Sequence, residues 1–255
     1  MIDLHSHILP GIDDGAADKA ASLEMLERAK AAGISKIAAT SHYSSEYERS
    51  YSAAFEEMEE AARNTGIQLL RGCEYSLTSF ASLDLKKLTP LGDSKYVLFD
   101  MNQNFIPPTM FELLFRVKLS GFKPLIAHPE RMRDKQELAP LLEKLGENNI
   151  CIQVNSGSIV GKYGREAQDN AFAILSQGAC HLVANDAHDP NGFHFAHCAE
   201  MLKKKYGEHN ANLLMKLNPA RVLENRELED MDKEESFMDW LFRSLREWRT
   251  PRSQE

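Results

Sequence analysis

The first fifteen residues, MIDLHSHILPGIDDG, carry two histidines one residue apart and then two adjacent aspartates. Side chains of alternate strand residues lie on the same face, so His5 and His7 are able to reach one metal ion. A hydrogen-bonded pair of core histidines and a single zinc site are the simpler alternatives. Asp13 and Asp14 have a second interpretation as caps of a following helix. The segment therefore allows, without requiring, the start of a larger metal centre.

More histidines and carboxylates follow at the ends of later apolar segments, which in parallel barrels form the active-site rim. These residues are His42 in ATSHY, Glu74 in LLRGCEY, Asp100 in YVLFDM, His128 in LIAHPER, and Asp186 and His188 in VANDAHD. Burying so many ionisable groups without a cation is costly because each charge needs a partner. The basic residues near them in sequence are only Arg71, Arg131 and Arg133. The pattern favours metal ions over internal salt bridges.

The donor types restrict the metal and its use. Histidine with carboxylate suits Mn²⁺, Fe²⁺ or Zn²⁺ better than Ca²⁺ or a thiolate-bound ion. The four cysteines, none spaced as CxxC, are expected to be reduced thiols rather than ligands. Three divalent ions and a hydroxide among four carboxylates would leave a small positive charge, whereas two ions would leave a negative one. A three-ion centre would therefore attract a phosphate group and activate water.

The elements that must position these residues alternate along the chain. Seven apolar segments are expected to be strands: Ile2–His5, Lys36–Thr40, Gln68–Gly72, Tyr96–Met101, Pro124–His128, Ile150–Asn155 and His181–Asn185. Helical patterns lie between most of them, several ending just before a glycine: Ala20–Ala32, Tyr47–Asn64, Pro108–Leu119, Leu138–Glu147, Glu166–Ser176 and Phe193–Tyr206. Parallel βα units follow, and an α/β fold with a closed or nearly closed barrel fits better than an open doubly wound sheet.

The C-terminal part differs from the rest. From Arg226 onward the chain is highly charged, and SFMDWLFRSLREW then places four apolar residues on one helical face: Phe237, Leu241, Leu245 and Trp248. We therefore expect a barrel domain over residues 1–225 and an extension over residues 226–255 with an appended C-terminal amphipathic helix.

Composition excludes several classes of protein. The formal net charge of −8 argues against a nucleic-acid partner. No apolar run approaches the roughly 20 residues that cross a bilayer, so no membrane insertion is expected. The N-terminus lacks the basic and apolar segments of a signal peptide, and a cytoplasmic location is the default.

The ordered motif set resembles a known family. HSH near the N-terminus, His42, His128 and the DAH pair resemble the four motifs of the polymerase and histidinol phosphatase (PHP) domain. MIDLHSHILPGIDDG, HPER, QVNSGSIVGKYG, NDAHD and NPARVLEN are most similar to metal-dependent protein-tyrosine phosphatases of bacterial capsule and exopolysaccharide clusters. The resemblance runs from Met1 to about Asn225. It implies the PHP fold, a distorted (β/α)7 TIM-like barrel, with a trinuclear site that most often holds manganese.

The resemblance also implies nine ligands for three metals. The first metal would be held by His5, His7, Glu74 and Asp186. The second would share Glu74 and be held also by Asp100 and His128. The third would be held by Asp14, His42 and His188. Position 100 departs from the more usual Glu, so its shorter side chain allows a water-mediated contact. Asn185 stands where the family usually has Ser.

The remaining implied roles concern the substrate. Arg131 in HPER would bind its phosphate, and Asp186 or a strand-end histidine would be the general acid, if one is needed. Tyr43, Phe105 and Tyr163 could pack against a phosphotyrosine ring, with Tyr43 the first candidate because it follows His42. The implied partner is a tyrosine-phosphorylated kinase of polysaccharide export. The oligomeric state stays open.

Three alternatives also stay open at this point. A histidinol-phosphate phosphatase or other small-molecule phosphoesterase would share the fold. A nuclease would share it too, although the acidic charge argues against this. A metal-stabilised binding module would bind metal without turning over a phosphoester.

Overall fold

The computed structural model describes residues 1–44, 47–78, 84–101 and 103–232. Their strands pair in parallel in two sheets. The first sheet has the order β1 (Ile2–Ser6), β2 (Lys36–Ala39), β3 (Gln68–Arg71). The second has the order β4 (Glu74–Ser76), β5 (Tyr96–Asp100), β6 (Lys123–Ala127), β7 (Cys151–Asn155), β8 (Leu182–Ala184). The expected α/β fold with parallel strands is confirmed.

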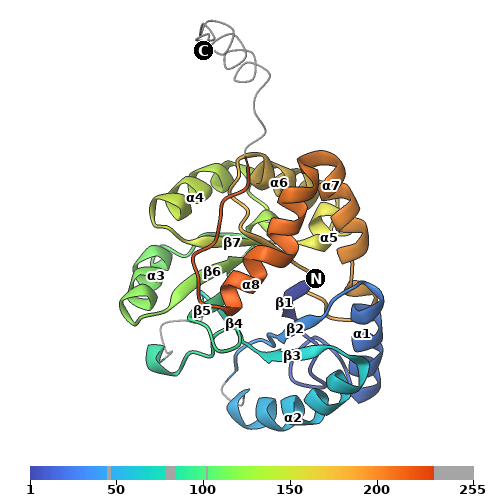
Figure 1. The fold of residues 1–255 in the computed structure, drawn as a ribbon. Helices are drawn as coiled ribbons and strands as arrows, with labels where there is room; N and C mark the ends of the chain where they lie inside the picture. Colours follow the sequence, from blue (N-terminus) through green and yellow to red (C-terminus); the bar gives the residue numbers. More distant parts are fainter. Residues whose placement is uncertain (45–46, 79–83, 102, 233–255) are drawn as a thin grey trace, which may run out of the picture.

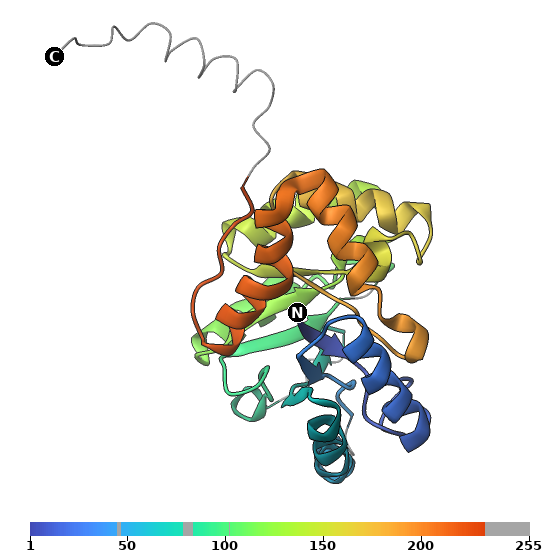
Figure 2. The same ribbon diagram turned by 45° about the vertical axis from the view of Figure 1, so that its right-hand side comes forward.

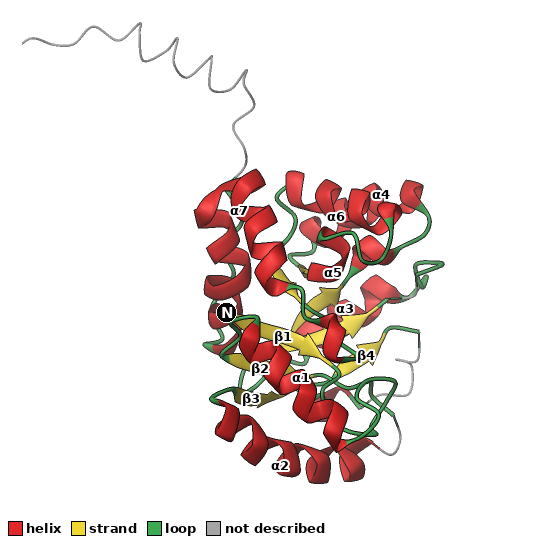
Figure 3. Cartoon of the chain, turned by 90° about the vertical axis from the view of Figure 1, so that its right-hand side faces the viewer, coloured by secondary structure: helices red, strands yellow, loops and turns green. Residues whose placement is uncertain are grey.

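Helices surround the strands (Figure 1), and Figure 3 shows the strands between α2 on one side and α4, α6 and α7 on the other. The helices are α1 (Lys19–Ala31), α2 (Tyr47–Thr65), α3 (Met110–Leu119), α4 (Lys135–Glu147), α5 (Ser156–Ile159), α6 (Arg165–Ser176), α7 (Phe195–Asn212) and α8 (Asn218–Leu223). The expected helices are found within about three residues of their ends, except that α7 continues to Asn212, beyond the expected end at Tyr206. The helices α5 and α8 were missed. The helical path of α7 breaks at Gly207, where φ is 84°, and Figure 2 shows α7 and α8 in orange folding back on each other.

The expected third strand divides at Gly72. The segment Gln68–Arg71 pairs with β2, and Glu74 opens β4 instead of ending the third strand, so that part of the prediction was wrong. A Cβ on Gly72 would lie 2.9 Å from Thr40 Cγ2, so the strand is interrupted at a position where a larger residue would clash. Because of this interruption, Glu74 is the first residue of a strand in the second sheet.

Single bridges connect the two sheets at both edges. Ser6 pairs with Ala187, next to a hydrogen bond of 2.9 Å from the amide of Asp186 to the carbonyl of His5. His42 pairs with Glu74 at the other edge. Residues placed far apart in the sequence therefore meet at the C-terminal ends of the strands.

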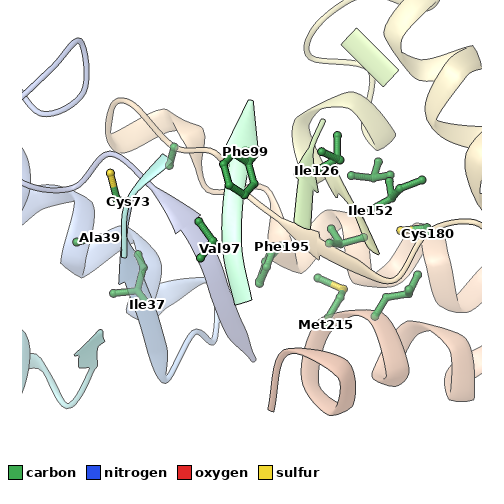
Figure 4. Close-up of a cluster of buried hydrophobic side chains, with 14 of the residues drawn as sticks. Ile37, Ala39, Cys73, Val97, Phe99, Ile126, Ile152, Cys180, Phe195 and Met215 are labelled. Carbon is green, nitrogen blue, oxygen red and sulfur yellow. The ribbon is translucent and has the colours of Figure 1, made fainter. Parts of the chain in front are cut away.

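Alternation along the strands divides the core into two layers. Tyr96 and Leu98 belong to an inner cluster that Val222 of α8 also joins. Val97 and Phe99 belong to the outer cluster between strands and helices (Figure 4). The inner apolar cluster therefore occupies the space between the strands toward their N-terminal ends. The inward positions at the C-terminal ends carry polar side chains.

Residues 226–232 pack back onto the domain. The hydroxyl of Tyr96 donates to the carbonyl of Arg226 at 2.7 Å, and Asn218 Nδ2 donates to the carbonyl of Glu229 at 2.8 Å. Met231 is buried. The expected amphipathic helix at 237–248 lies outside the described residues. Among the residues that are described, no helix combines the length and the apolar character needed to span a membrane.

Candidate metal centre

The pairing of β1 with β2 places His5 and His7 together at the end of the strand. The register shifts between Asp3 and Ser6. Leu4 lies in the inner apolar cluster, and both histidines are fully buried with their Nε2 atoms 3.3 Å apart. The prediction that these two rings converge is confirmed.

Each of these rings is tied through its other nitrogen. His7 Nδ1 lies 2.7 Å from Asp13 Oδ2, and His5 Nδ1 lies 2.9 Å from Gln153 Oε1. Oxygens of a carboxylate and an amide accept hydrogen bonds, so each Nδ1 carries the proton. Such a partner fixes the tautomer and leaves Nε2 as the metal-binding atom.

Two carboxylates meet these Nε2 atoms. Asp186 Oδ1 lies 3.2 Å from His5 Nε2 and 3.3 Å from His7 Nε2. The oxygens of Glu74 lie 3.3 Å from the same two atoms. Donors at about 2.0–2.1 Å from a tetrahedral ion are about 3.3 Å apart, so this spacing fits one metal among them.

Glu74 extends the cluster in two directions. Its Oε1 lies 3.2 Å from His128 Nε2, and its Oε2 lies 3.0 Å from His42 Nδ1. Asp100 lies at the edge, with Oδ1 3.8 Å from His128 Nδ1, and it joins none of the close donor sets among the described residues. The other eight expected ligands do fall in such sets.

The outermost set lies at the surface. Asp14 Oδ1 is 3.5 Å from both His42 Nε2 and His188 Nε2, and the Asp14 side chain is 70 % exposed. The rings of His7 and His188 stack with centroids 3.9 Å apart. The donors therefore form a continuous path from the buried pair to solvent.

The buried carboxylates require positive charge. Burial alone would raise the pKa of Glu74, but the imidazoles of His5, His128 and His42 hold it well below its usual range. Burial likewise opposes charge on His128, yet Glu74 and Asp186 raise its pKa to about 9. Glu74 Oε2 and Asp186 Oδ1 are buried and make no well-formed hydrogen bond. Divalent ions would supply positive charge to the buried carboxylates and a partner to these two oxygens, so the donor set fits metal binding.

Backbone strain coincides with two of these residues. His128, directly after β6, has φ 36°, and Asp186, two residues after the end of β8, has φ 53°. A non-glycine residue in this region costs of order 1–3 kcal/mol, and such residues cluster at functional sites. The conformation turns both side chains toward the cluster.

A cleft of about 430 Å³ opens above the donors. Arg131 lies in its wall, donates from Nη1 to Asp186 Oδ2 at 3.2 Å, and packs over the ring of Tyr163 at 5.0 Å. Lys162 and His194 also line the cleft. Tyr43 is outside this lining, and its ring stacks on Tyr75.

Comparison with known proteins identifies the family. The model of the family described as "Capsular polysaccharide synthesis, CpsB/CapC" matches residues 1–224. The chain belongs to the CpsB/CapC family. It is 34 % identical over 233 residues to the tyrosine-protein phosphatase YwqE of Bacillus subtilis, covering 85 % of this chain and 92 % of that protein. It is 26 % identical over 238 residues to the tyrosine-protein phosphatase CpsB of Streptococcus pneumoniae, covering 88 % and 98 %.

A solved structure supports the CpsB/CapC assignment. It comes from work on YwqE from Bacillus subtilis and CpsB from Streptococcus pneumoniae, described as unique metal-dependent tyrosine phosphatases. The TM-score is 0.83 at 31 % identity, with 90 % of this chain and 97 % of that chain covered. The architecture of this chain is therefore that of the family.

In this CpsB/CapC chain, the structure decides between the two interpretations of Asp13, which does not cap the helix that follows. The α1 helix is capped by Asp18, whose side chain accepts from the amide of Ala21 at 2.9 Å. Asp13 instead holds His7 and accepts from the amide of His42 at 2.8 Å. The only sequence signal for this role of Asp13 was its position six residues after the candidate ligand His7.

Three further residues lie away from the donors. Cys73 is buried in the outer core, and Arg165 is the exposed first residue of α6. Asn185 bonds to Asp3 through Nδ2 at 2.7 Å, away from the donors. Gln153, Lys162 and His194 were not predicted to face the site.

Proposed function

We propose that this chain is a metal-dependent phosphotyrosine-protein phosphatase. One observation carries the proposal: Arg131 lines the same open cleft as donors from all three convergent His and carboxylate sets. The relatives named above are tyrosine-protein phosphatases, which supports the same reaction here. The site is a wide cleft rather than a closed cavity, which suits a protein side chain.

The proposed ligands are those of the sequence analysis. Three ions would be held by His5, His7, Asp14, His42, Glu74, Asp100, His128, Asp186 and His188. Asp100 would act through water because it lies apart from the donor sets. Mn²⁺ is the proposed ion, with Fe²⁺ and Zn²⁺ as alternatives that the same donors suit. The bridges at both sheet edges support a distorted (β/α)7 barrel of the PHP type.

The residues of this chain divide the work around the phosphate. When bound, divalent ions lower the pKa of water and polarise a phosphoryl oxygen. The guanidinium of Arg131 presents two parallel donors that match phosphate oxygens. Asp186 holds Arg131 in place and so contributes to catalysis through its orientation. A tyrosyl leaving group has a pKa of about 10, so it needs less protonation than an alkoxide.

Aromatic rings near the cleft would contact the substrate ring. Tyr163 is half-exposed, lines the cleft and lies under Arg131. Tyr43 is similarly exposed but lies beyond the lining, so it would contact only a substrate that extends past the rim. Each such contact would contribute about 0.5–1.5 kcal/mol beyond area burial.

The proposed biological setting follows from the family description. The partner would be a tyrosine-phosphorylated protein, a kinase of polysaccharide export, in the cytoplasm. The free state of the described cysteines supports a reducing compartment. The catalytic unit would be residues 1–225, and residues 226–255 would be an extension that begins packed against it.

The test combines metal analysis with turnover. Protein purified without chelator should contain two to three equivalents of transition metal and release phosphate from a phosphotyrosyl peptide. Chelation should abolish release, and added Mn²⁺ should restore it. Full activity with one equivalent would contradict the trinuclear site. Metal binding without turnover of any phosphoester would indicate a binding module instead.

A further inference from the structure

Strand β7 supplies none of the proposed ligands, yet it sends two polar side chains into the site. Gln153 and Asn155 are fully buried, whereas Ile152 and Val154 between them belong to the outer apolar cluster. We propose that Gln153 and Asn155 form a polarised amide relay that fixes the tautomer of His5 and the orientation of Asp186. This inference rests on the proposed metal site.

The relay is continuous from one proposed ligand to another. Asn155 Nδ2 donates to Asp186 Oδ2 at 2.8 Å, and Gln153 Nε2 donates to Asn155 Oδ1 at 2.7 Å. Gln153 Oε1 then lies 2.9 Å from His5 Nδ1. Three successive hydrogen bonds therefore join two residues that are to hold the same ion.

The direction of every bond follows from Asp186. An ionised carboxylate only accepts hydrogen bonds, so Asn155 must turn its NH₂ group toward it. The amide oxygen of Asn155 then faces Gln153, which must answer with its own NH₂ group. The oxygen of Gln153 is left for His5, whose Nδ1 must carry the proton. The tautomer of His5 is thus set by a carboxylate two side chains away.

The relay also assigns the two oxygens of Asp186. Oδ2 accepts from Asn155 and from Arg131, whereas Oδ1 makes no hydrogen bond and lies 3.2 Å from His5 Nε2. The two atoms aimed at the ion are therefore the Asp186 oxygen that accepts no hydrogen bond and the His5 nitrogen that carries no proton.

The backbone holds the relay against the short 3-10 helix Pro129–Arg131. The amide of Asn155 donates to Glu130 Oε1 at 2.9 Å, and the hydroxyl of Ser158 donates to the same oxygen at 2.7 Å. Glu130 precedes Arg131 in sequence and is fully buried. The relay is thus held at Asp186 and His5 by its own hydrogen bonds, and at Asn155 by the side chain of Glu130.

The test measures Zn²⁺ binding by competition with a chelator and observes the His5 ring by nitrogen NMR. The variants are Gln153→Met, Asn155→Ala and their double variant. Asn210→Ala is the matched control because Asn210 is also a buried amide, bonded to the carbonyls of Tyr206 and Asp232 far from the donors. Thermal melting of each variant reports whether it folds.

Each single variant should weaken Zn²⁺ binding about 10–100-fold, as loss of a group that orients a ligand does. The double variant should bind Zn²⁺ about as tightly as whichever single variant binds it more weakly. Either single change already breaks the relay, so the second change removes no further interaction. The control should bind normally even if its melting temperature falls. The wild-type protein loaded with Zn²⁺ should show an exchange-protected proton on His5 Nδ1 that Gln153→Met loses.

Normal Zn²⁺ affinity in both single variants, or losses that add in the double variant, would overturn the relay. If the variants fail to fold, the wild-type spectrum decides alone, and a His5 ring without a proton on Nδ1 refutes the proposal. A wild-type protein that binds no Zn²⁺ or Mn²⁺ would instead refute the proposed function itself.

Discussion

Arg131 Nη1 lies 3.2 Å from Asp186 Oδ2, although the two residues are 55 positions apart. The other oxygen of Asp186 faces the rings of His5 and His7. One carboxylate therefore connects the proposed phosphate-binding group to the proposed metal centre. This link explains why the guanidinium, which is about one third exposed, has a defined position at the cleft wall.

Replacement of Arg131 should separate binding of metal from turnover. Arg131→Ala should keep the metal content and lower kcat by about 10²–10³, because one stabilising contact to the transition state is lost. Arg131→Lys should also be slow, since an ammonium cannot make two parallel bonds. Steady-state kinetics beside elemental analysis measures both effects. Arg165→Ala, at a 92 % exposed side chain, is the control. Near-normal kcat in Arg131→Ala would show that the guanidinium has no part in the reaction.

Removal of metal should lower stability. The carboxylates of Glu74 and Asp186 converge with two imidazoles in a buried space, and a bound cation stabilises only the folded arrangement. At a hundredfold excess over Kd this contributes about 2.7 kcal/mol, or roughly 5–10 °C in melting temperature at this size. Thermal melts of stripped protein with Mn²⁺ added will test it, with Ca²⁺ as the control ion. Equal melting temperatures with and without Mn²⁺ would contradict the proposed metal centre.

The convergence of the ligands could be predicted because it depends on simple rules. His5 and His7 share a face by alternation, and His128 and Asp186 end strands of parallel units, whose C-terminal ends meet. No rule of this kind predicts the interruption of the strand at Gly72, where Thr40 approaches closely. The start of β4 at Glu74 therefore could not be predicted from the sequence.

The groups that hold the ligands were harder to predict. Gln153 looks like any inward strand residue. Its role depends on His5, which is distant in sequence and close only in the fold, as well as on its neighbour Asn155. Asp13 could cap the following helix by its position, but Asp18 is the residue that caps it. Pairwise contacts of this kind have no local pattern.

The partly buried imidazole of His181 should make stability depend on pH. Its Nδ1 accepts from the amide of Ile152 at 3.1 Å, and burial lowers its pKa below the usual 6.5. The unfolded chain then binds the proton more readily, so this contribution is complete above about pH 6.5 and is lost as pH falls toward the lower folded pKa. His181→Asn keeps an acceptor without titrating. Its unfolding free energy should fall less steeply between pH 7 and 5 than that of the wild-type protein. Parallel pH curves would contradict this.

The position of a C-terminal truncation should matter. A chain ending at Asp232 retains Met231, which is buried, and Leu228, which packs on the inner cluster. A chain ending at Asn225 loses both, which should cost at least about 2 kcal/mol and roughly 4–8 °C in melting temperature. Calorimetry of the two chains measures the difference, and kcat/KM at low temperature should be similar. Equal stability would show that residues 226–232 contribute nothing to the fold.

Substrate preference tests the central claim most directly. The measurement is kcat/KM of the Mn²⁺-loaded protein on one peptide phosphorylated on tyrosine, its serine counterpart and histidinol phosphate. We expect the phosphotyrosyl peptide to be turned over much faster than the other two. Its phosphorus lies farther from the backbone than that of phosphoserine, so it can reach donors below the rim of the cleft. Faster turnover of histidinol phosphate would contradict the account and indicate a small-molecule phosphatase.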